Sequence, residues 1–329
     1  MIRRAARRTA LALAGLLLAS CAKGGAAAAD ARLPRLVSAT FPMTLAWAGA
    51  EFVLSAPPQR ILPANAAWID YVSLLVGPER VVALPAEAFG YSRLASAPGA
   101  WAELPPFPVF EGERILALAP DLVLAHTWQN PETIAGLLRA RVPVLVVPVP
   151  ESWSEITATL ALLGAVLGVP ERAQVVASEL AARRTHLSAR AARFAGLRAL
   201  SYTNLGAGGW TSGSGTTGQI LLELAGLCNA AAEAGLTGDV PADQERLLAL
   251  APDFFLVSRP DRTEHSPPSA SFLLAEPALA HLEALRARRI VTLAPALFSS
   301  ASPELLRGAE ELVDALEEWE RAGTLSVDD

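Results

Sequence analysis

Aromatic, basic and histidine side chains gather in four stretches of the sequence, each of which follows a predicted strand. PAEAFGYSRL and HTWQN lie in the first half of the chain, and GAGGWTSGSGT and RPDRTEHS lie in the second half. Aromatic rings offer a large contact area to a flat ligand, and arginine guanidinium groups can bind its carboxylates. The predicted ligand contacts are Phe89, Tyr91, His126, Trp128, Trp210, Arg259 and Arg262, with Arg93 and His265 in the same stretches.

The histidines in these loops could also ligate a metal. His126 and His265 could each be an axial ligand of haem or a ligand of another bound metal. A bare zinc or manganese site usually needs three or four His, Asp or Glu ligands. The chain has four histidines, and His186 and His281 lie in predicted helices away from these loops. The sequence therefore disfavours a site for a free metal ion, and we expect no resident cofactor.

A glycine-rich loop supports a different class of function. GSGTTG, which includes Gly213, Gly215 and Gly218, matches the GxGxxG pattern of dinucleotide-binding proteins, and Glu233 follows fifteen residues later. That pattern usually follows its strand directly, whereas eight residues separate it from Asn204 here. An NAD-dependent oxidoreductase is therefore retained as an alternative. A hydrolase has little support because the sequence lacks a GxSxG nucleophile motif, and an adhesion protein would leave the aromatic loops unexplained.

Alternating strands and helices are expected to position these loops. Short apolar runs such as RVVAL, DLVLA, VLVVPV and DFFLVS alternate with helical stretches, a pattern typical of a mainly parallel sheet covered on both faces. Helix formers without glycine or proline fill residues 171–194. The sequence predicts an α/β fold of two Rossmann-like lobes, 35–169 and 197–329, joined by a long rigid helix over 170–196. The ligand cleft would lie between the lobes.

One twelve-residue segment occurs once in each predicted lobe. ERILALAPDLVL at 113–124 and ERLLALAPDFFL at 245–256 share nine identical positions. Pro120 and Pro252 are expected to end the helix in each copy, because proline disfavours helix in the residue before it. The next residue, an aspartate, leads into a buried strand. The repeat therefore predicts the same helix–turn–strand unit in both lobes.

The N-terminal residues have the features of an export signal. Four arginines precede the apolar run LALAGLLLA, which is too short to span a bilayer as a helix. LASC is similar to a bacterial lipobox, so we expect residues 1–20 to be removed and Cys21 to be lipidated. Residues 21–34 would form a flexible tether. The mature protein would be exported and lipid-anchored to the cell envelope, facing the periplasm or the cell surface.

Charge and cysteine content narrow the range of partners. Residues 1–20 contain four of the 27 basic side chains and no acids, so the remaining chain has 23 basic and 33 acidic side chains, a net charge of −10. Nucleic acid is a poor partner for such a chain. Cys228 has no thiol to pair with once Cys21 is lipidated, so we expect it to be a buried, inert thiol.

The order of several long stretches resembles one known family. PQRILPANAAWIDYVSLLVGPERVVAL, the two repeat copies, GGWTSGSGTTGQILLELAGLCNAAAEAG and ALRARRIVTLAPALF cover most of the chain from about residue 58. Together they are similar to the ferric-siderophore and cobalamin class of periplasmic binding proteins, the helical-backbone metal receptors that serve ABC importers. The resemblance implies a non-enzymatic, monomeric solute-binding protein that delivers a chelate to a permease dimer and its ATPase subunits.

The resemblance also implies roles for particular residues. In that family a glutamate on each lobe docks onto the permease, and the matching positions here are Glu113 and Glu245. The lobes are expected to close by only a few degrees. An iron–siderophore complex is the first expectation for the ligand, with haem or cobalamin as alternatives. Asp239 and Val240 stand where we would expect an aromatic residue in a cobalamin-binding cleft.

Overall fold

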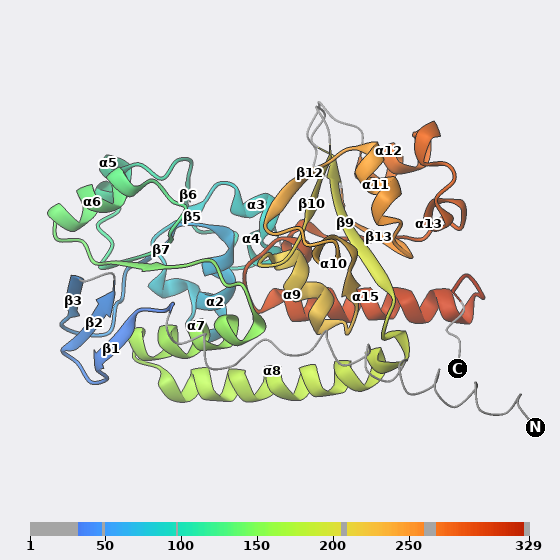
Figure 1. The fold of residues 1–329 in the computed structure, drawn as a ribbon. Coiled ribbons are helices and arrows are strands. Elements are labelled where there is room, and N and C mark those ends of the chain that lie inside the picture. The colour runs from blue at the N-terminus through green and yellow to red at the C-terminus, as the bar shows by residue number, and fades with distance from the viewer. Residues whose placement is uncertain (1–31, 48–49, 97, 205–208, 260–267, 326–329) are drawn as a thin grey trace, which may run out of the picture.

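The computed structural model describes residues 32–47, 50–96, 98–204, 209–259 and 268–325. Two α/β lobes lie side by side, and the long helix α8 (Pro170–Ala191) runs along one side of both (Figure 1). A short 3-10 turn, η3 (Ala192–Phe194), follows α8 and leads into the second lobe. The predicted signal segment, the lipidation site Cys21 and most of the predicted tether lie outside the described residues.

The first lobe is built on a parallel sheet with the strand order β4-β7-β8. The pair β5-β6, also parallel, lies next to it. The strands are β4 (Ile61–Pro63), β5 (Leu84–Pro85), β6 (Pro106–Phe107), β7 (Leu122–His126) and β8 (Val144–Val147). The helices are α2 (Ala66–Leu75), η2 (Pro78–Arg80), α3 (Ala88–Tyr91), α4 (Arg93–Ser96), α5 (Gly112–Ala117), α6 (Pro131–Arg139) and α7 (Trp153–Val166).

A small antiparallel sheet precedes the first lobe. Its strands β1 (Arg35–Ser38), β2 (Met43–Trp47) and β3 (Ala50–Leu54) follow one another along the chain. Met43 and Leu45 point into the core, whereas Thr44 between them is partly exposed. Alternation with a period of two is the signature of a half-buried strand. Strands β2 and β3 were not predicted, although this alternation is present in the sequence.

The second lobe has a larger mixed sheet with the order β12-β10-β9-β13-β14, and β11 also pairs with β9. Strands β11, β9, β13 and β14 run parallel, while β10 is antiparallel to both its neighbours. The strands are β9 (Arg198–Asn204), β10 (Gly209–Ser212), β11 (Cys228–Asn229), β12 (Asp239–Ala242), β13 (Phe254–Ser258) and β14 (Ile290–Leu293).

Helices cover the sheet of the second lobe. They are α9 (Thr217–Leu224), α10 (Ala230–Glu233), α11 (Gln244–Leu250), α12 (Ser269–Ala275), η4 (Pro277–Leu279), α13 (Glu283–Arg286), α14 (Pro295–Phe298) and α15 (Glu304–Arg321). Cys228, at the start of β11, is half-buried. The prediction that it is buried was therefore wrong. The mixed α/β layers and parallel sheets confirm the predicted fold class.

The repeated segment forms the same structural unit in both lobes. Helix α5 or α11 is followed by a left-handed alanine, with φ of 47° at Ala119 and 38° at Ala251. The next two residues are proline and aspartate, and they lead into β7 or β13. This confirms the helix–turn–strand prediction.

An arginine fastens each copy of this unit to the preceding strand. Arg60 donates through Nε to the carbonyl of Ala119 at 2.8 Å and through a guanidinium nitrogen to Leu118 at 2.7 Å. Arg198 donates through its two terminal guanidinium nitrogens to the carbonyls of Ala251 and Leu250, both at 3.0 Å. These bonds satisfy carbonyls that the end of a helix leaves unpaired. The repeated letters LALAPD therefore encode a structural clamp used once per lobe.

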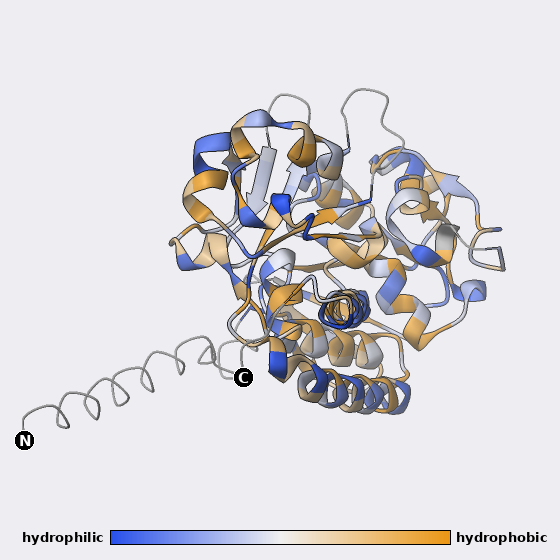
Figure 2. Ribbon diagram, turned by 90° about the vertical axis from the view of Figure 1, so that its right-hand side faces the viewer, coloured by the Kyte–Doolittle hydropathy of each residue, from blue (hydrophilic) through white to orange (hydrophobic). Residues whose placement is uncertain are grey.

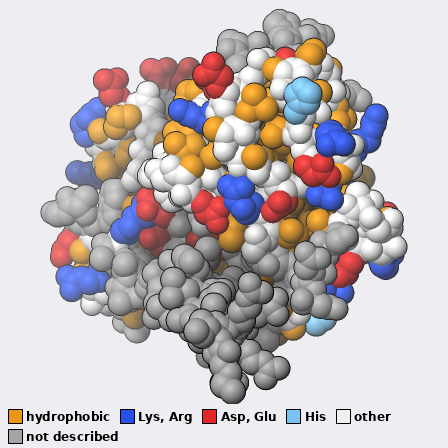
Figure 3. All heavy atoms as spheres, turned by 45° about the vertical axis from the view of Figure 1, so that its right-hand side comes forward, with side chains coloured by type: hydrophobic (Ala, Val, Ile, Leu, Met, Phe, Trp, Pro, Cys, Tyr) orange, Lys and Arg blue, Asp and Glu red, His pale blue; other side chains and the backbone are white. Residues whose placement is uncertain are grey.

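The surface mixes hydrophobic and charged residues. The helices around the sheets carry both hydrophobic and hydrophilic stretches, as expected for a layer between core and solvent (Figure 2). Basic and acidic side chains are interspersed on the face in Figure 3. Within the described part of the chain, no helix combines the length and apolar character needed to cross a bilayer.

Candidate functional site

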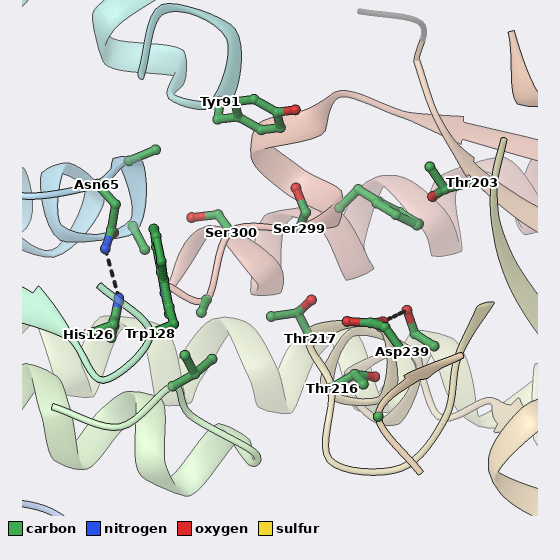
Figure 4. A pocket seen from close by; sticks show the side chains of 18 of the residues that line it. Asn65, Tyr91, His126, Trp128, Thr203, Thr216, Thr217, Asp239, Ser299 and Ser300 are labelled. Atoms are coloured by element: carbon green, nitrogen blue, oxygen red, sulfur yellow. Dashed lines mark hydrogen bonds between the residues drawn. The ribbon is translucent and has the colours of Figure 1, made fainter. Parts of the chain in front are cut away.

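A cleft of about 850 Å³ lies between the two lobes. Side chains from both halves of the chain converge on it (Figure 4). Its first-lobe wall comes from the start of α2, from α3, from the residues after β7, and from Val149 after β8. Its second-lobe wall comes from β9, β10, β12, the glycine-rich loop before α9, and residues 298–301. A cleft of this volume falls in the range of pockets that bind small molecules and cofactors.

Four of the predicted ligand contacts line this cleft: Tyr91, His126, Trp128 and Trp210. Tyr91 lies at the end of α3 and is 42% exposed, while Trp128, just after β7, is 63% exposed. Trp210 on β10 belongs to the other lobe and is 40% exposed. Large aromatic side chains left open to solvent on both sides of a cleft provide contact area for a bulky ligand.

The remaining predicted contacts lie elsewhere. Phe89 on α3 is 39% exposed but is not among the lining residues, and neither is the exposed Arg259 after β13. Arg93 instead pairs with Glu304 of α15 at 3.2 Å. Ligand contact by Phe89 and Arg259 stays a prediction. Arg262 and His265 lie outside the described residues.

Several lining residues were not predicted. Asn65 and the first residues of α2 follow β4 and therefore lie at the carboxyl end of a strand. Ligand clefts in α/β proteins form at the carboxyl ends of parallel strands, so this position could have been predicted. Glu87 was quoted within its loop but not singled out. Residues 299–301 follow the short helix α14 rather than a strand, so no local signal marked them. Asp239, noted only as a departure from a cobalamin-type cleft, also lines the wall.

His126 is held in the wall by a buried network. Asn65 caps α2 by accepting a hydrogen bond at Oδ1 from the backbone of Trp68, so its amide nitrogen donates to His126 Nδ1 at 2.9 Å. The imidazole also stacks on Trp68, with ring centroids 4.7 Å apart. Gln129 Oε1 accepts from the backbone N–H of His126 at 2.8 Å. Asn65 and Trp68 therefore hold the ring, and Gln129 holds the backbone of His126.

These contacts set the chemistry of His126. Burial lowers its pKa to about 4, so the ring is neutral at physiological pH. Because Nδ1 accepts from Asn65, the proton lies on Nε2, which is shielded from solvent and has no hydrogen-bond partner among the described residues. As positioned, His126 cannot offer a lone pair to a metal in the cleft. Its role in this geometry is to orient the wall.

The glycine-rich loop lines the cleft but differs from a dinucleotide fingerprint. Gly215 and Gly218 face the cleft, and Thr216 caps α9 by accepting a hydrogen bond from the backbone of Gln219. Gly215 has a φ of +73°, which favours glycine. The strand before the loop, β10, is antiparallel to its neighbours. A dinucleotide fingerprint joins a parallel strand to its helix, so this geometry argues against an NAD site.

The charged side chains that line the cleft are acidic. Among the described lining residues, Glu87 and Asp239 are the ionisable carboxylates, and none is lysine or arginine. Asp239 accepts a hydrogen bond from the Ser212 hydroxyl at 2.7 Å. The other polar lining groups are mainly the hydroxyls of Thr203, Ser212, Thr216, Thr217, Ser299 and Ser300. Within the described residues, no three His, Cys, Asp or Glu side chains gather into a metal-binding group.

Comparison with known proteins identifies the family. Residues 104–297 match the family model of the periplasmic binding protein, which is more than half of the chain. The chain belongs to the periplasmic binding protein family. A comparison with curated protein sequences found no significant match. The predicted family resemblance is thereby confirmed at the level of this periplasmic binding protein family.

Solved structures of similar fold include other family members. RhuT, a periplasmic haem-binding protein from Roseiflexus sp. RS-1, has a TM-score of 0.69 and 26% identity, covering 79% of this chain and 98% of that one. A periplasmic haem-binding protein from Pseudomonas aeruginosa has a TM-score of 0.67 and 26% identity, covering 78% and 92%.

A more distant structure supports the fold alone. The protein of an ABC-type Fe³⁺-hydroxamate transport system from Saccharomonospora viridis has a TM-score of 0.68 and 20% identity, covering 84% of this chain and 99% of that one. These similarities, together with the two lobes and the cleft between them, confirm the predicted two-lobe architecture. The family consists of binding proteins for transport rather than enzymes.

Proposed function

We propose that this protein is the non-enzymatic solute-binding component of an ABC importer and that it captures haem in the interlobe cleft. The observation that carries the proposal is the pair of aromatic walls: Tyr91 and Trp128 on one lobe face a cleft bordered by Trp210 on the other. A flat macrocycle gains most from aromatic surfaces on both of its faces. The similar structures at 26% identity are described as haem-binding proteins, which supports the same ligand class.

Tyr91 is the residue we assign to the haem iron. Tyrosine and histidine are common axial ligands of haem, and Tyr91 and His126 are the described lining residues of these two types. The Nε2 atom of His126 is buried and protonated in the neutral ring. Tyr91 is 42% exposed and its side chain reaches over the cleft (Figure 4). A phenolate from Tyr91 is therefore the better-placed ligand.

The acidic lining constrains the orientation of the ligand. Glu87 and Asp239 would repel the two carboxylates of haem if these pointed into the cleft. We therefore expect the carboxylate edge to face the mouth and the ring edge to face the floor. Arg259 remains a predicted contact for a ligand carboxylate, because it is exposed after β13.

A titration with haemin tests this assignment. The apoprotein should bind one haem per chain, with the absorption spectrum of a phenolate-ligated ferric haem. Tyr91→Phe should remove that spectrum and weaken binding at least tenfold, whereas Tyr202→Phe, at a buried tyrosine outside the cleft lining, should leave both unchanged. An unaltered spectrum in Tyr91→Phe would show that Tyr91 is not the ligand.

A ferric siderophore is the second ligand candidate. The hydroxyl groups along the second-lobe wall can donate hydrogen bonds to the oxygens of a neutral hydroxamate complex without needing basic side chains. The same titration, repeated with a ferric trihydroxamate and with cyanocobalamin and followed by tryptophan fluorescence, distinguishes the ligands. Tighter binding of the trihydroxamate than of haemin would favour the siderophore.

The export, anchoring and docking assignments belong to the same proposal. Glu113 and Glu245 are exposed in the first turns of α5 and α11. In Figure 1 both helices lie on the side of their lobes away from α8. A carboxylate at a helix start is favoured by the helix dipole and can bind an arginine with two hydrogen bonds. We propose that these residues dock the monomeric protein onto a permease dimer, with Cys21 lipidated to hold it at the membrane.

A further inference from the structure

A buried carboxyl joins the two lobes beneath the cleft. Asp70 on α2 is 4% exposed, and its Oδ2 accepts hydrogen bonds from the hydroxyls of Ser300 and Ser302, each at 2.7 Å. The buried hydroxyl of Ser92 also lies near this carboxyl and acts to lower its pKa. Ser300 and Ser302 also contact one another at 2.9 Å. We call Asp70, Ser92, Ser300 and Ser302 the interlobe cluster.

The members of the interlobe cluster come from both sides of the cleft. Asp70 and Ser92 belong to the first lobe, and Ser92 directly follows the cleft residue Tyr91. Ser300 and Ser302 lie between α14 and α15 in the second lobe, and Ser300 itself lines the cleft. Any separation of the lobes at this point must break the hydrogen bonds between Asp70 and the second-lobe hydroxyls.

We propose that the interlobe cluster is a proton-sensitive latch: protonated Asp70 holds the lobes together under the cleft, and its ionisation loosens them. This regulation is independent of which ligand the cleft binds. It would make the separation of the lobes depend on the pH of the surroundings.

The physical basis is the cost of a buried charge. Burial raises the pKa of Asp70 to about 7, although the hydrogen bonds from Ser300 and Ser302 act in the opposite direction, and the negative charge of Glu304 raises it further. When the lobes part, water can reach the carboxyl and its pKa falls toward the ordinary value of 3.8. The joined state therefore binds the proton more tightly than the parted state.

The direction of the pH effect follows from the linkage between proton binding and the joined state. A carboxyl whose pKa is raised in the joined state stabilises that state at low pH, and this contribution is lost as the pH rises to about 7. One proton changes the equilibrium by at most about tenfold per pH unit across this window. Neutral to alkaline conditions should loosen the floor of the cleft.

Titratable and charged groups from both lobes surround Asp70. Burial raises the pKa of Tyr71 on the same helix well above 10, so its phenol stays neutral. Glu304 of α15 pairs with Arg93 of α4 at 3.2 Å. These two opposite charges face the interlobe cluster from both lobes.

The packing of α2 brings one further acid into the region. On α7, Glu155 interacts electrostatically with Tyr71. It forms an ion pair with Arg32 at 3.1 Å and accepts a hydrogen bond from the backbone of Glu151. Asp70, with its pKa raised to about 7, changes its charge around neutral pH.

The test compares the apoprotein with Asp70→Asn, which keeps the shape and removes the titration. Urea unfolding is measured for both proteins at pH 5, 6, 7 and 8. As the pH rises toward 7, the unfolding equilibrium constant of the wild type should increase relative to that of the variant by up to about tenfold per pH unit. The difference should level off above pH 8. His126 titrates in both proteins, so its effect cancels. Parallel profiles would overturn the proposal. The exposed Glu223→Gln on α9 is the matched control and should follow the wild type.

Hydrogen exchange separates local loosening from global unfolding. The amides of Ser302 and Leu305 bond to the carbonyls of Ser300 and Ser302. After correction for intrinsic rates, they should exchange faster at pH 8 than at pH 6 in the wild type but equally in Asp70→Asn. Equal protection at both pH values in the wild type would contradict the latch. If Asp70→Asn does not fold, Ser302→Ala removes one donor and should shift the profile to higher pH, and an unshifted profile would also contradict the latch.

Discussion

Arg190 on α8 and Glu317 on α15 are joined by two hydrogen bonds, from Nε to Oε1 at 3.1 Å and from a terminal guanidinium nitrogen to Oε2 at 2.9 Å. Earlier on the same two helices, Arg183 of α8 makes the same kind of paired contact with Glu310 of α15, at 3.0 and 2.6 Å. The connecting helix is thus fastened along the last helix of the second lobe. We expect this pairing of the two helices to limit how far the lobes can close.

Removal of the Arg190 contact should cost stability without affecting ligand binding. The hydrogen bonds with the Glu317 carboxylate raise the pKa of Arg190, and those from Arg190 lower the pKa of Glu317. The pair is partly exposed, so Arg190→Ala should destabilise the protein by about 1 kcal/mol. The difference should shrink in 1 M salt because the charges are screened. Arg184→Ala, at an exposed arginine of the same helix, is the control for urea unfolding.

Ligand binding should produce little compaction. Because α8 runs without a break between the lobes and is paired with α15, it resists hinge bending. Small-angle scattering of the protein with and without saturating haemin should give nearly equal radii of gyration. A clear compaction on binding would show that the paired helices do not limit closure.

The repeat clamp should be a stability determinant in both lobes. Asp121 accepts hydrogen bonds from the backbone N–H groups of Gln59 and Arg60, at 2.7 and 2.8 Å, and Asp253 accepts one from Arg198 at 2.7 Å. Asp121→Ala or Asp253→Ala removes these hydrogen bonds from exposed or half-buried donors, which should cost about 0.5–1.5 kcal/mol per bond in chemical denaturation. The loss should be larger for Asp121→Ala. Glu179→Ala, an exposed site on α8, should have no effect.

The aromatic walls should provide much of the binding energy. Trp128→Ala and Trp210→Ala should each weaken chelate binding by about 1–3 kcal/mol, or roughly ten- to hundredfold. Phe89→Ala tests how far the ligand reaches, because Phe89 is a predicted contact that is 39% exposed, almost the same as Trp210, yet does not line the cleft. A titration in which Phe89→Ala loses as much affinity as Trp210→Ala would mean that the ligand extends beyond the cleft described here.

Permease docking should be separable from ligand capture. Glu113→Ala and Glu245→Ala should bind the chelate normally but reduce import in cells, and the double variant should be the most impaired. Glu132→Ala is the control, because Glu132 is also an exposed glutamate in the first turn of a helix. Normal import by the double variant would exclude these residues as the docking pair.

Much of the fold was predictable because the local signals agreed. The proline after each ERxLALA segment ends its helix, and the long run of helix formers from Pro170 forms α8. The strand pair β2–β3 of the small antiparallel sheet was missed. Only the alternation between buried Met43 and Leu45 and the partly exposed Thr44 marked it.

Part of the cleft lining was predicted from the sequence, and the reason for success or failure differs between residues. Tyr91 and Trp128 follow β5 and β7, and Trp210 lies on β10, which follows β9, so their places after predicted strands were enough to predict that they line the cleft. Arg93 could not be placed from sequence, because its partner Glu304 lies in the other lobe. The link from Asp70 to Ser300 spans 230 residues and depends on the packing of both lobes, which no local pattern reveals.

The most direct measurement of the central claim is native mass spectrometry of the mature protein isolated from cells grown with haem, with ferric siderophore or with corrinoid. The two-lobe cleft predicts one iron chelate per chain, most abundant in the haem-fed cells, and its loss in a Trp128→Ala/Trp210→Ala double variant that remains folded. A protein that carries no chelate under any of these conditions, or that retains its ligand in the folded double variant, would contradict the account.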